Sequence, residues 1–231
     1  MSEPAKAKQL AQALVKTANS LGMRSQALIT DMNQPLGSAV GHSIEVLECI
    51  NLLRGEIDEG ARPVLDLSIE LAARMVVLAK SENTIEAARD RIKRIHESGA
   101  ALETFRANVS AQGGDPRVCD DPGRILPLTD KAFEVESPRS GFVTKVSTAE
   151  VGHAIAEAGG GRVRIEDKID PRVGFVAKIK IGDQVRAGDS IGVIFCEDAG
   201  RGEAAVARIK AAYEIGEASV EPPQLVKEVI D

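Results

Sequence analysis

The chain has 231 residues, of which 43% are hydrophobic, 28% are charged and only 3% are aromatic, and its net charge is -6. These proportions are typical of a soluble globular protein with an aliphatic core, and they exclude a disordered chain. Lysine and arginine are dispersed among acidic residues, which excludes a nucleic acid or an anionic membrane as the expected partner. No apolar run approaches the roughly 20 residues that span a bilayer, and the first residues lack a signal-peptide pattern, so we expect a cytoplasmic protein.

The first half of the sequence carries the hydrophobic period of amphipathic helices. A short run at 26–30, β-branched at its end and followed by a loop rich in turn residues, is typical of a buried strand. Residues 1–112 therefore predict a partial α/β domain. The expected helices cover 4–21, 43–54, 64–79, 84–98 and 100–111.

Glycine and proline interrupt the segment 112–127, which predicts irregular structure and places a linker at 113–130. Beyond the linker the hydrophobic period changes to two, so we expect 131–231 to form an α+β domain. The turn GDQVRAGD at 182–189 is typical of a barrel-sandwich fold. The fold class predicted is thus α/β, with a helix-rich part of a mixed α/β domain followed by a smaller α+β barrel-sandwich-like C-terminal domain. Its expected strands lie within 132–137, 141–147, 161–167, 174–183 and 190–198, and its helices at 148–158 and 201–216.

The loop after the first expected strand is the first candidate for a ligand site. A strand end that runs through a loop into a helix N-terminus leaves backbone amides and carbonyls free to point outward. The carbonyls of Leu36 and Ala39 and the carboxylate of Glu48 are hard oxygen donors suited to a monovalent or calcium-like cation. The alternative is a solvated loop with a surface glutamate, in which Asp31 only forms a turn.

The same segment resembles a known family. The stretch ALITDMNQPLGSAVGHSIEVLECINLLRG at 27–55 is similar to the T-D-M-x-Q-x-L loop and following helix of thymidine and pyrimidine-nucleoside phosphorylases. The similarity continues in AGGGR at 158–162, in Asp167 and Asp170, and in KIGDQV, and so resembles the C-terminal half of the family. In some members a cation is held by the positions that match Leu36, Ala39 and Glu48.

The resemblance implies a pentosyltransferase that converts a pyrimidine (deoxy)nucleoside and inorganic phosphate into free base and (deoxy)ribose 1-phosphate. It also implies a homodimer, with phosphate as co-substrate and no further required cofactor. The family binds phosphate with a K-x-S-T-G-G-x-G-D loop and the base with an arginine, a serine and a lysine, all in a region that precedes the match to Met1. No residue of this sequence is therefore assigned to catalysis or substrate binding, and we expect a fragment that is inactive by itself.

Two other interpretations of the sequence stay open. The chain is either a non-catalytic interaction module, or a subunit that completes an active site with a separately encoded N-terminal half. A carrier domain would need a modified lysine at the tip of an exposed hairpin, a context that is absent around the lysines Lys145, Lys168, Lys178 and Lys180.

The remaining polar features predict structural roles. The glycines at 159–161 and Arg162 follow a helix and precede a strand, which is the reverse of a phosphate-binding loop and favours a helix stop. The histidines form no pattern with a nucleophile, and the cysteines form no CxxC pair, so we expect ordinary histidines and buried free thiols. These residues are His42, His96 and His153, and Cys49, Cys119 and Cys196.

Overall fold

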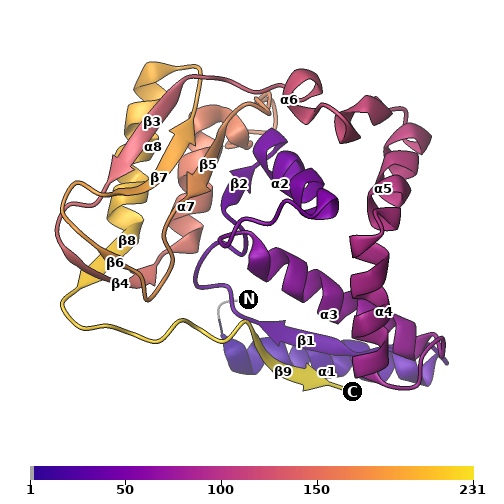
Figure 1. Ribbon diagram of the computed structural model, residues 1–231. Helices are drawn as coiled ribbons and strands as arrows, with labels where there is room; N and C mark the ends of the chain where they lie inside the picture. Colours follow the sequence, from indigo (N-terminus) through magenta and orange to yellow (C-terminus); the bar gives the residue numbers. More distant parts are fainter. Residues whose placement is uncertain (1–2) are drawn as a thin grey trace. The chain divides into compact units, whose positions relative to one another are not determined.

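The computed structural model describes residues 3–231 (Figure 1). They divide into two compact units, each built from separate stretches of chain. Unit 1 contains the residues up to Asp31, Leu65–Ile95 and Pro223–Asp231, and unit 2 contains Met32–Val64 and His96–Pro222. The predicted domain boundary at 113–130 stays a prediction.

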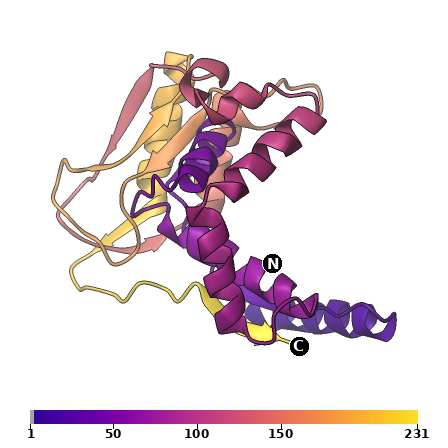
Figure 2. The same cartoon turned by 45° about the vertical axis from the view of Figure 1, so that its right-hand side comes forward.

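Unit 1 is built on a two-stranded antiparallel sheet. Its strands β1 and β9 are far apart in the sequence but pair with Ala27 opposite Ile230. They lie side by side against helix α1 in both views (Figures 1 and 2). Ala11 and Val15 of α1 pack on Ile230, because their spacing of four residues places them on one face of the helix. The elements are α1 (Pro4–Ser20), β1 (Ala27–Thr30), β9 (Val226–Ile230), most of α3 (Arg62–Leu78) and most of α4 (Ile85–Glu97).

A partly buried ion triad joins α3 to α4 in unit 1. The Glu70 carboxylate accepts hydrogen bonds of 2.7 Å from Arg74 Nε and 2.7 Å from Arg89 Nε. Burial by itself would raise the pKa of Glu70, but the hydrogen bonds from Arg89 and Arg74 outweigh it and hold that pKa below its usual value. The triad is therefore a charged contact that depends on the ionised carboxylate.

Unit 2 contains a four-stranded antiparallel sheet in the order β2-β5-β7-β3. Its central strands are the most apolar, and Phe175, Ile191 and Ile194 are fully buried. Each such side chain stabilises the fold by about 1.5–3 kcal/mol. A side chain on Gly192 would collide with the Phe175 ring, so the close packing requires glycine there. The strands are β2 (Ala39–Gly41), β3 (Ala132–Glu136), β5 (Gly174–Ala177) and β7 (Ser190–Phe195).

A second sheet of unit 2 has the order β6-β4-β8 and shares one core with the first. Val143, Tyr213 and Ile215 bring its apolar face into that core. Two helices line the same core, with Val151 from α7 and Ile209 from α8. These elements are β4 (Gly141–Val146), β6 (Gln184–Val185), β8 (Tyr213–Gly216), α7 (Thr148–Ile155) and α8 (Ala199–Ala212).

The prediction of irregular structure at 112–127 is wrong. The segment forms a 3-10 helix η1 (Pro116–Cys119) and a short helix α6 (Pro122–Ile125), each with its proline at the start. Val118 and Cys119 are buried against Ile50 of α2 (Ser43–Arg54) and against α5 (Ala100–Ala111). Arg54 adds hydrogen bonds to the Cys119 carbonyl, of 2.7 Å from Nη2 and 3.2 Å from Nε. These tertiary contacts order a segment in which local propensity is weak.

Other local predictions also need correction. The segment 161–167 forms turns instead of a strand, with Asp167 accepting hydrogen bonds from the backbone of Val163 and Arg164. The predicted helix 201–216 ends at Ala212, and its last four residues form β8. The sequence analysis does not predict the strands β2, β6 and β9. The mixed α/β class, with a helix-rich part and a smaller α+β part, is confirmed. No helix among the described residues is long and apolar enough to cross a membrane.

Candidate functional site

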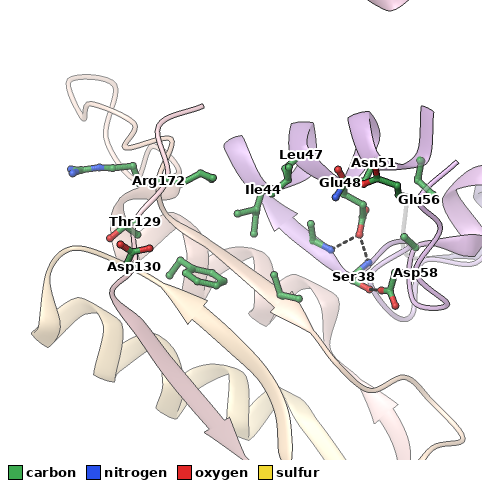
Figure 3. A pocket seen from close by; sticks show the side chains of 16 residues that line it. Ser38, Ile44, Leu47, Glu48, Asn51, Glu56, Asp58, Thr129, Asp130 and Arg172 are labelled. Atoms are coloured by element: carbon green, nitrogen blue, oxygen red, sulfur yellow. Dashed lines mark hydrogen bonds between the residues drawn. The ribbon is translucent and has the colours of Figure 1, made fainter. Parts of the chain in front are cut away.

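The predicted cation loop lies in unit 2, between Met32 and the start of β2. Glu48, one turn into α2, points back at this loop (Figure 3). Its Oε1 accepts hydrogen bonds from the backbone N–H groups of Ser38 at 2.8 Å and Ala39 at 2.9 Å. Two of the three predicted residues, Ala39 and Glu48, are therefore in direct contact, and the carboxylate is not a solvated surface group.

The loop is also fixed by close packing around Gly37 and Ser38. A side chain on Gly37 would overlap the other carboxylate oxygen of Glu48, so only glycine leaves room for it. The Ser38 hydroxyl donates to Asp58 at 3.1 Å, and its carbonyl accepts from the N–H of Ala177 at 2.8 Å. The loop is thus bound both to the turn before α3 and to the end of β5.

A lysine also binds the loop, through its backbone carbonyls. Lys180, in the connection between β5 and β6, donates from Nζ to the carbonyls of Pro35 at 2.6 Å and Gly37 at 2.5 Å. The Leu36 carbonyl lies at 3.5 Å from the same nitrogen, at the limit of a hydrogen bond. Burial lowers the pKa of the Lys180 ammonium to about 8, against the opposing effect of the nearby carboxylates, chiefly Glu48.

The ligand role of Leu36, Ala39 and Glu48 stays a prediction, and the structure shows how their oxygens are placed. In a strand, the N–H and C=O of one residue point to the same side. Because the Ala39 N–H donates to Glu48, its carbonyl faces the same edge of β2 as that carboxylate. The Leu36 carbonyl is only weakly engaged by Lys180. Among residues 3–231 no cluster of three or more His, Cys, Asp or Glu side chains suits a metal ion.

A pocket of about 390 Å³ adjoins the loop (Figure 3). Its walls come from α2, from the strands β2, β5 and β7, and from the segment 128–130. The lining combines an apolar surface with several carboxylates, which makes it a concave site of the size of a small ligand. The apolar side chains are Ile44, Leu47, Leu52, Leu128, Val176 and Phe195, and the acidic ones are Glu48, Glu56, Asp58 and Asp130.

Arg172 is the basic side chain that lines this pocket. Its guanidinium donates to Asp170 through Nε at 2.9 Å and Nη2 at 2.8 Å, and it lies 3.4 Å from Glu197. The hydrogen bond from Arg172 holds the pKa of Asp170 below its usual value. This arginine is therefore engaged with two carboxylates of the protein.

The glycine-rich turn stops a helix, as predicted. Helix α7 ends in a π turn (Ala156–Gly160), and Gly159 has φ 109°, a conformation that favours glycine. The Gly159 carbonyl accepts a hydrogen bond of 2.8 Å from the Asp170 N–H. The Gly160 carbonyl lies 2.6 Å from His42 Nε2. The turn thus uses carbonyls, which are not donors to a phosphate, to tie α7 to its surroundings.

The other histidines and the cysteines show no catalytic arrangement. His96 Nε2 lies 2.6 Å from the Leu52 carbonyl, and His153 lies 3.5 Å from Glu150. The prediction of buried thiols is correct for Cys119 and Cys196, but Cys49 is exposed.

Sequence reasoning missed several groups of this site. From the sequence, Lys180 is a candidate only for a carrier lysine, and no pattern marks Asp58 or Arg172. A sequence signal existed for Lys180, which lies inside the KIGDQV segment that carries the family resemblance. Its contact with residues more than 140 positions away requires the fold.

Comparison with known proteins agrees with this architecture. Residues 5–102 match the a/b domain of a glycosyl transferase family, and residues 142–216 match the pyrimidine nucleoside phosphorylase C-terminal domain. Pyrimidine-nucleoside phosphorylases of Staphylococcus aureus, from strains bovine RF122 / ET3-1 and USA300, are each 41% identical over 185 residues. That similarity covers 80% of this chain but 42% of either relative.

Together the two matched families define the class of protein: a glycosyltransferase a/b domain followed by a small α+β domain. The chain belongs to the pyrimidine-nucleoside phosphorylase family and matches part of its length. It spans less than half the length of the curated relatives.

Proposed function

We propose that this chain is the C-terminal part of a pyrimidine-nucleoside phosphorylase and that it supplies the scaffold and a cation-binding loop. The observation that carries the proposal is the loop 34–39, which is held by Glu48 on one side and by Lys180 on the other. In the reaction of the relatives' name, the bond from the sugar C1 to the base breaks and a phosphate oxygen bonds to C1. The base takes the electron pair and a proton.

Such a displacement needs donors on the phosphate and on the departing base. We propose that these donors come from a part that the relatives have and this sequence does not match, and that the chain alone is inactive. The test is phosphate-dependent release of uracil or thymine from uridine or thymidine, measured by chromatography. We expect turnover at background level for the chain alone. Release that requires phosphate and increases in proportion to chain concentration would contradict the inactivity.

The cation site is part of the same proposal. The carbonyls of Leu36 and Ala39 and the Glu48 carboxylate would bind a monovalent or calcium-like cation, which would add positive charge beside the loop. We expect ²⁰⁵Tl⁺ or ²³Na⁺ resonances to broaden in the presence of the chain and to recover on addition of K⁺. The same measurement with Glu48→Gln, which removes the anionic ligand, should show little broadening. Equal broadening with this variant would place any bound cation elsewhere.

A split enzyme or interaction module is the second candidate, and the surface of α1 favours it. Leu14 is 61% and Leu21 is 76% exposed, and neighbouring Met23 is 65% exposed. Among the described strands β1 pairs only with β9, and a two-stranded sheet with a small core is marginal by itself. A polypeptide that covers α1, either a second copy as in a homodimer or a separate N-terminal half, would bury this apolar surface.

This candidate is tested by adding the separately produced N-terminal part of a Staphylococcus aureus relative. Light scattering should show a complex, and phosphorolysis should appear in the mixture. Leu14→Asp should weaken the complex, whereas Lys16→Asp, on the same exposed helix, serves as the control for added negative charge. A chain that stays monomeric and shows no phosphorolysis in the mixture would rule out the split enzyme.

A further inference from the structure

The loop 34–38 lies between one cation and one anion of the protein. The carbonyls of Pro35 and Gly37 accept from the Lys180 ammonium, with that of Leu36 at the limit of a bond. The next two amides, of Ser38 and Ala39, donate to the Glu48 carboxylate. Consecutive carbonyls therefore meet a positive charge and consecutive amides meet a negative charge.

A second contact comes from the residue that follows the lysine. The Ile181 N–H donates to the Gln34 side-chain oxygen at 2.8 Å. The Lys180 N–H itself is taken by Asp183 at 2.7 Å, which fixes the turn that carries the lysine. The β5–β6 connection thus forms several hydrogen bonds with the loop, although about 145 residues separate the two segments in the sequence.

A surface ion pair does not explain this arrangement. Lys180 is partly buried, and its partners are backbone carbonyls and not a carboxylate. Bonds from a charged donor are stronger than those between neutral groups, and carbonyls that converge on one cation lose that arrangement when the charge is removed. The neighbouring Lys178, in contrast, is exposed and bonds Glu134 and Ser190.

We propose that Lys180 is the positioning residue of the loop: its ammonium acts as a tethered cation that holds the Pro35–Gly37 carbonyls and so sets where Leu36 presents its oxygen. The role of Leu36 as a ligand rests on the proposed cation site. The positioning role of Lys180 does not depend on that site, because the ammonium contacts the Pro35 and Gly37 carbonyls directly.

Amide hydrogen exchange of the full chain tests the positioning role. Lys180→Met keeps a long unbranched side chain but removes the charge. In this variant the amides of Ser38, Ala39 and Ile181 should exchange about 10- to 100-fold faster, which is the loss of protection expected for a charge-assisted hydrogen bond. Core amides of β7 should be unchanged. Lys180→Arg should restore most of the protection, and Lys178→Met is the matched control that should leave the loop amides as they are. Equal protection of the loop in Lys180→Met and in the unmodified chain would overturn the proposal.

Chemical rescue tests whether a donor cation is what the loop needs. Ethylammonium chloride should slow loop exchange in Lys180→Ala, because it returns an N–H donor to the space left by the lysine. Tetramethylammonium chloride has the same charge but no donor and should not. Equal effects of both salts, or no effect of either, would count against a tethered cation.

Cation binding separates this proposal from the proposed function. Lys180→Met should bind Tl⁺ more weakly than the unmodified chain, while Lys180→Arg and Lys178→Met should match it. If neither chain binds Tl⁺ but the loop still loosens in Lys180→Met, the positioning role holds and the cation site is wrong. If Tl⁺ binds equally well to both and the loop stays protected, the positioning role is wrong and the cation site holds.

Discussion

The carboxylate of Glu48 accepts a hydrogen bond of 2.9 Å from the backbone N–H of Ala39, and so links the first turns of α2 to the edge strand of a sheet. The same oxygen also accepts from Ser38. One acidic side chain therefore anchors the C-terminal end of the loop that carries the candidate site.

We expect Glu48→Ala to destabilise the chain by about 1–3 kcal/mol, because two partly buried amides lose their acceptor. Glu48→Gln keeps an acceptor oxygen and should cost less. Urea unfolding followed by circular dichroism measures both variants. The control is Glu217→Ala, which removes an exposed carboxylate. Glu45 is less suitable as a control because its carboxylate accepts a hydrogen bond from the Gly41 N–H. Equal stability of Glu48→Ala and the unmodified chain would show that the loop does not depend on this anchor.

Glu70 predicts a pH dependence of stability. Its pKa is lower in the folded chain than in the unfolded chain, because Arg89 and Arg74 bond the ionised form. The unfolded chain therefore binds the proton more readily, so the stabilisation is complete above the unfolded pKa of about 4.3 and is lost as the pH falls through the lower folded pKa.

At pH 7 Glu70→Gln should cost about 1–3 kcal/mol. The difference from the unmodified chain should shrink as the pH falls below about 4. Denaturant titrations between pH 7 and 3.5 measure this difference in the free energy of unfolding. Glu86→Gln is the control, since the Glu86 side chain is 78% exposed and its contact with Arg89, at 3.8 Å, is long. A difference that is constant with pH would rule out ionisation as its cause.

The Tyr213 hydroxyl is buried without a hydrogen-bond partner among the described residues, and burial raises its pKa. Removing an unsatisfied buried polar group removes its desolvation cost. Tyr213→Phe should therefore stabilise the chain, by about 1 kcal/mol, and raise its thermal midpoint by several degrees. Loss of stability in this variant would indicate that the hydroxyl finds a partner, such as an ordered water.

Two glycines of unit 2 should respond in opposite directions to alanine. Gly152 lies exposed inside α7, and an added side chain would meet no atom within 4 Å, so Gly152→Ala should gain about 0.5–1 kcal/mol from helix propensity. At Gly192 the added carbon would overlap the Phe175 ring, so Gly192→Ala should cost about 1–3 kcal/mol. Thermal unfolding of the two variants side by side gives the comparison. A stabilising Gly192→Ala would show that the ring has room to move.

The sequence by itself determined the helices of the first half, because the apolar residues of segments such as 43–54 recur on one helical face. It also determined the family, and it pointed to Ala39 and Glu48, which prove to be in contact. Tertiary structure decided the segments whose local pattern is weak. The segments 116–119 and 122–125 become helical because Val118 and Cys119 bury against Ile50 and Ile125 packs on the same cluster. The segment 226–230 becomes a strand because β1, about 200 residues earlier in the sequence, offers it an edge. Lys180 is the clearest case, since the sequence shows one lysine among several. Only the fold brings its ammonium to the carbonyls of Pro35 and Gly37. There the short distance and the partial burial strengthen the electrostatic attraction between the ammonium and these carbonyls.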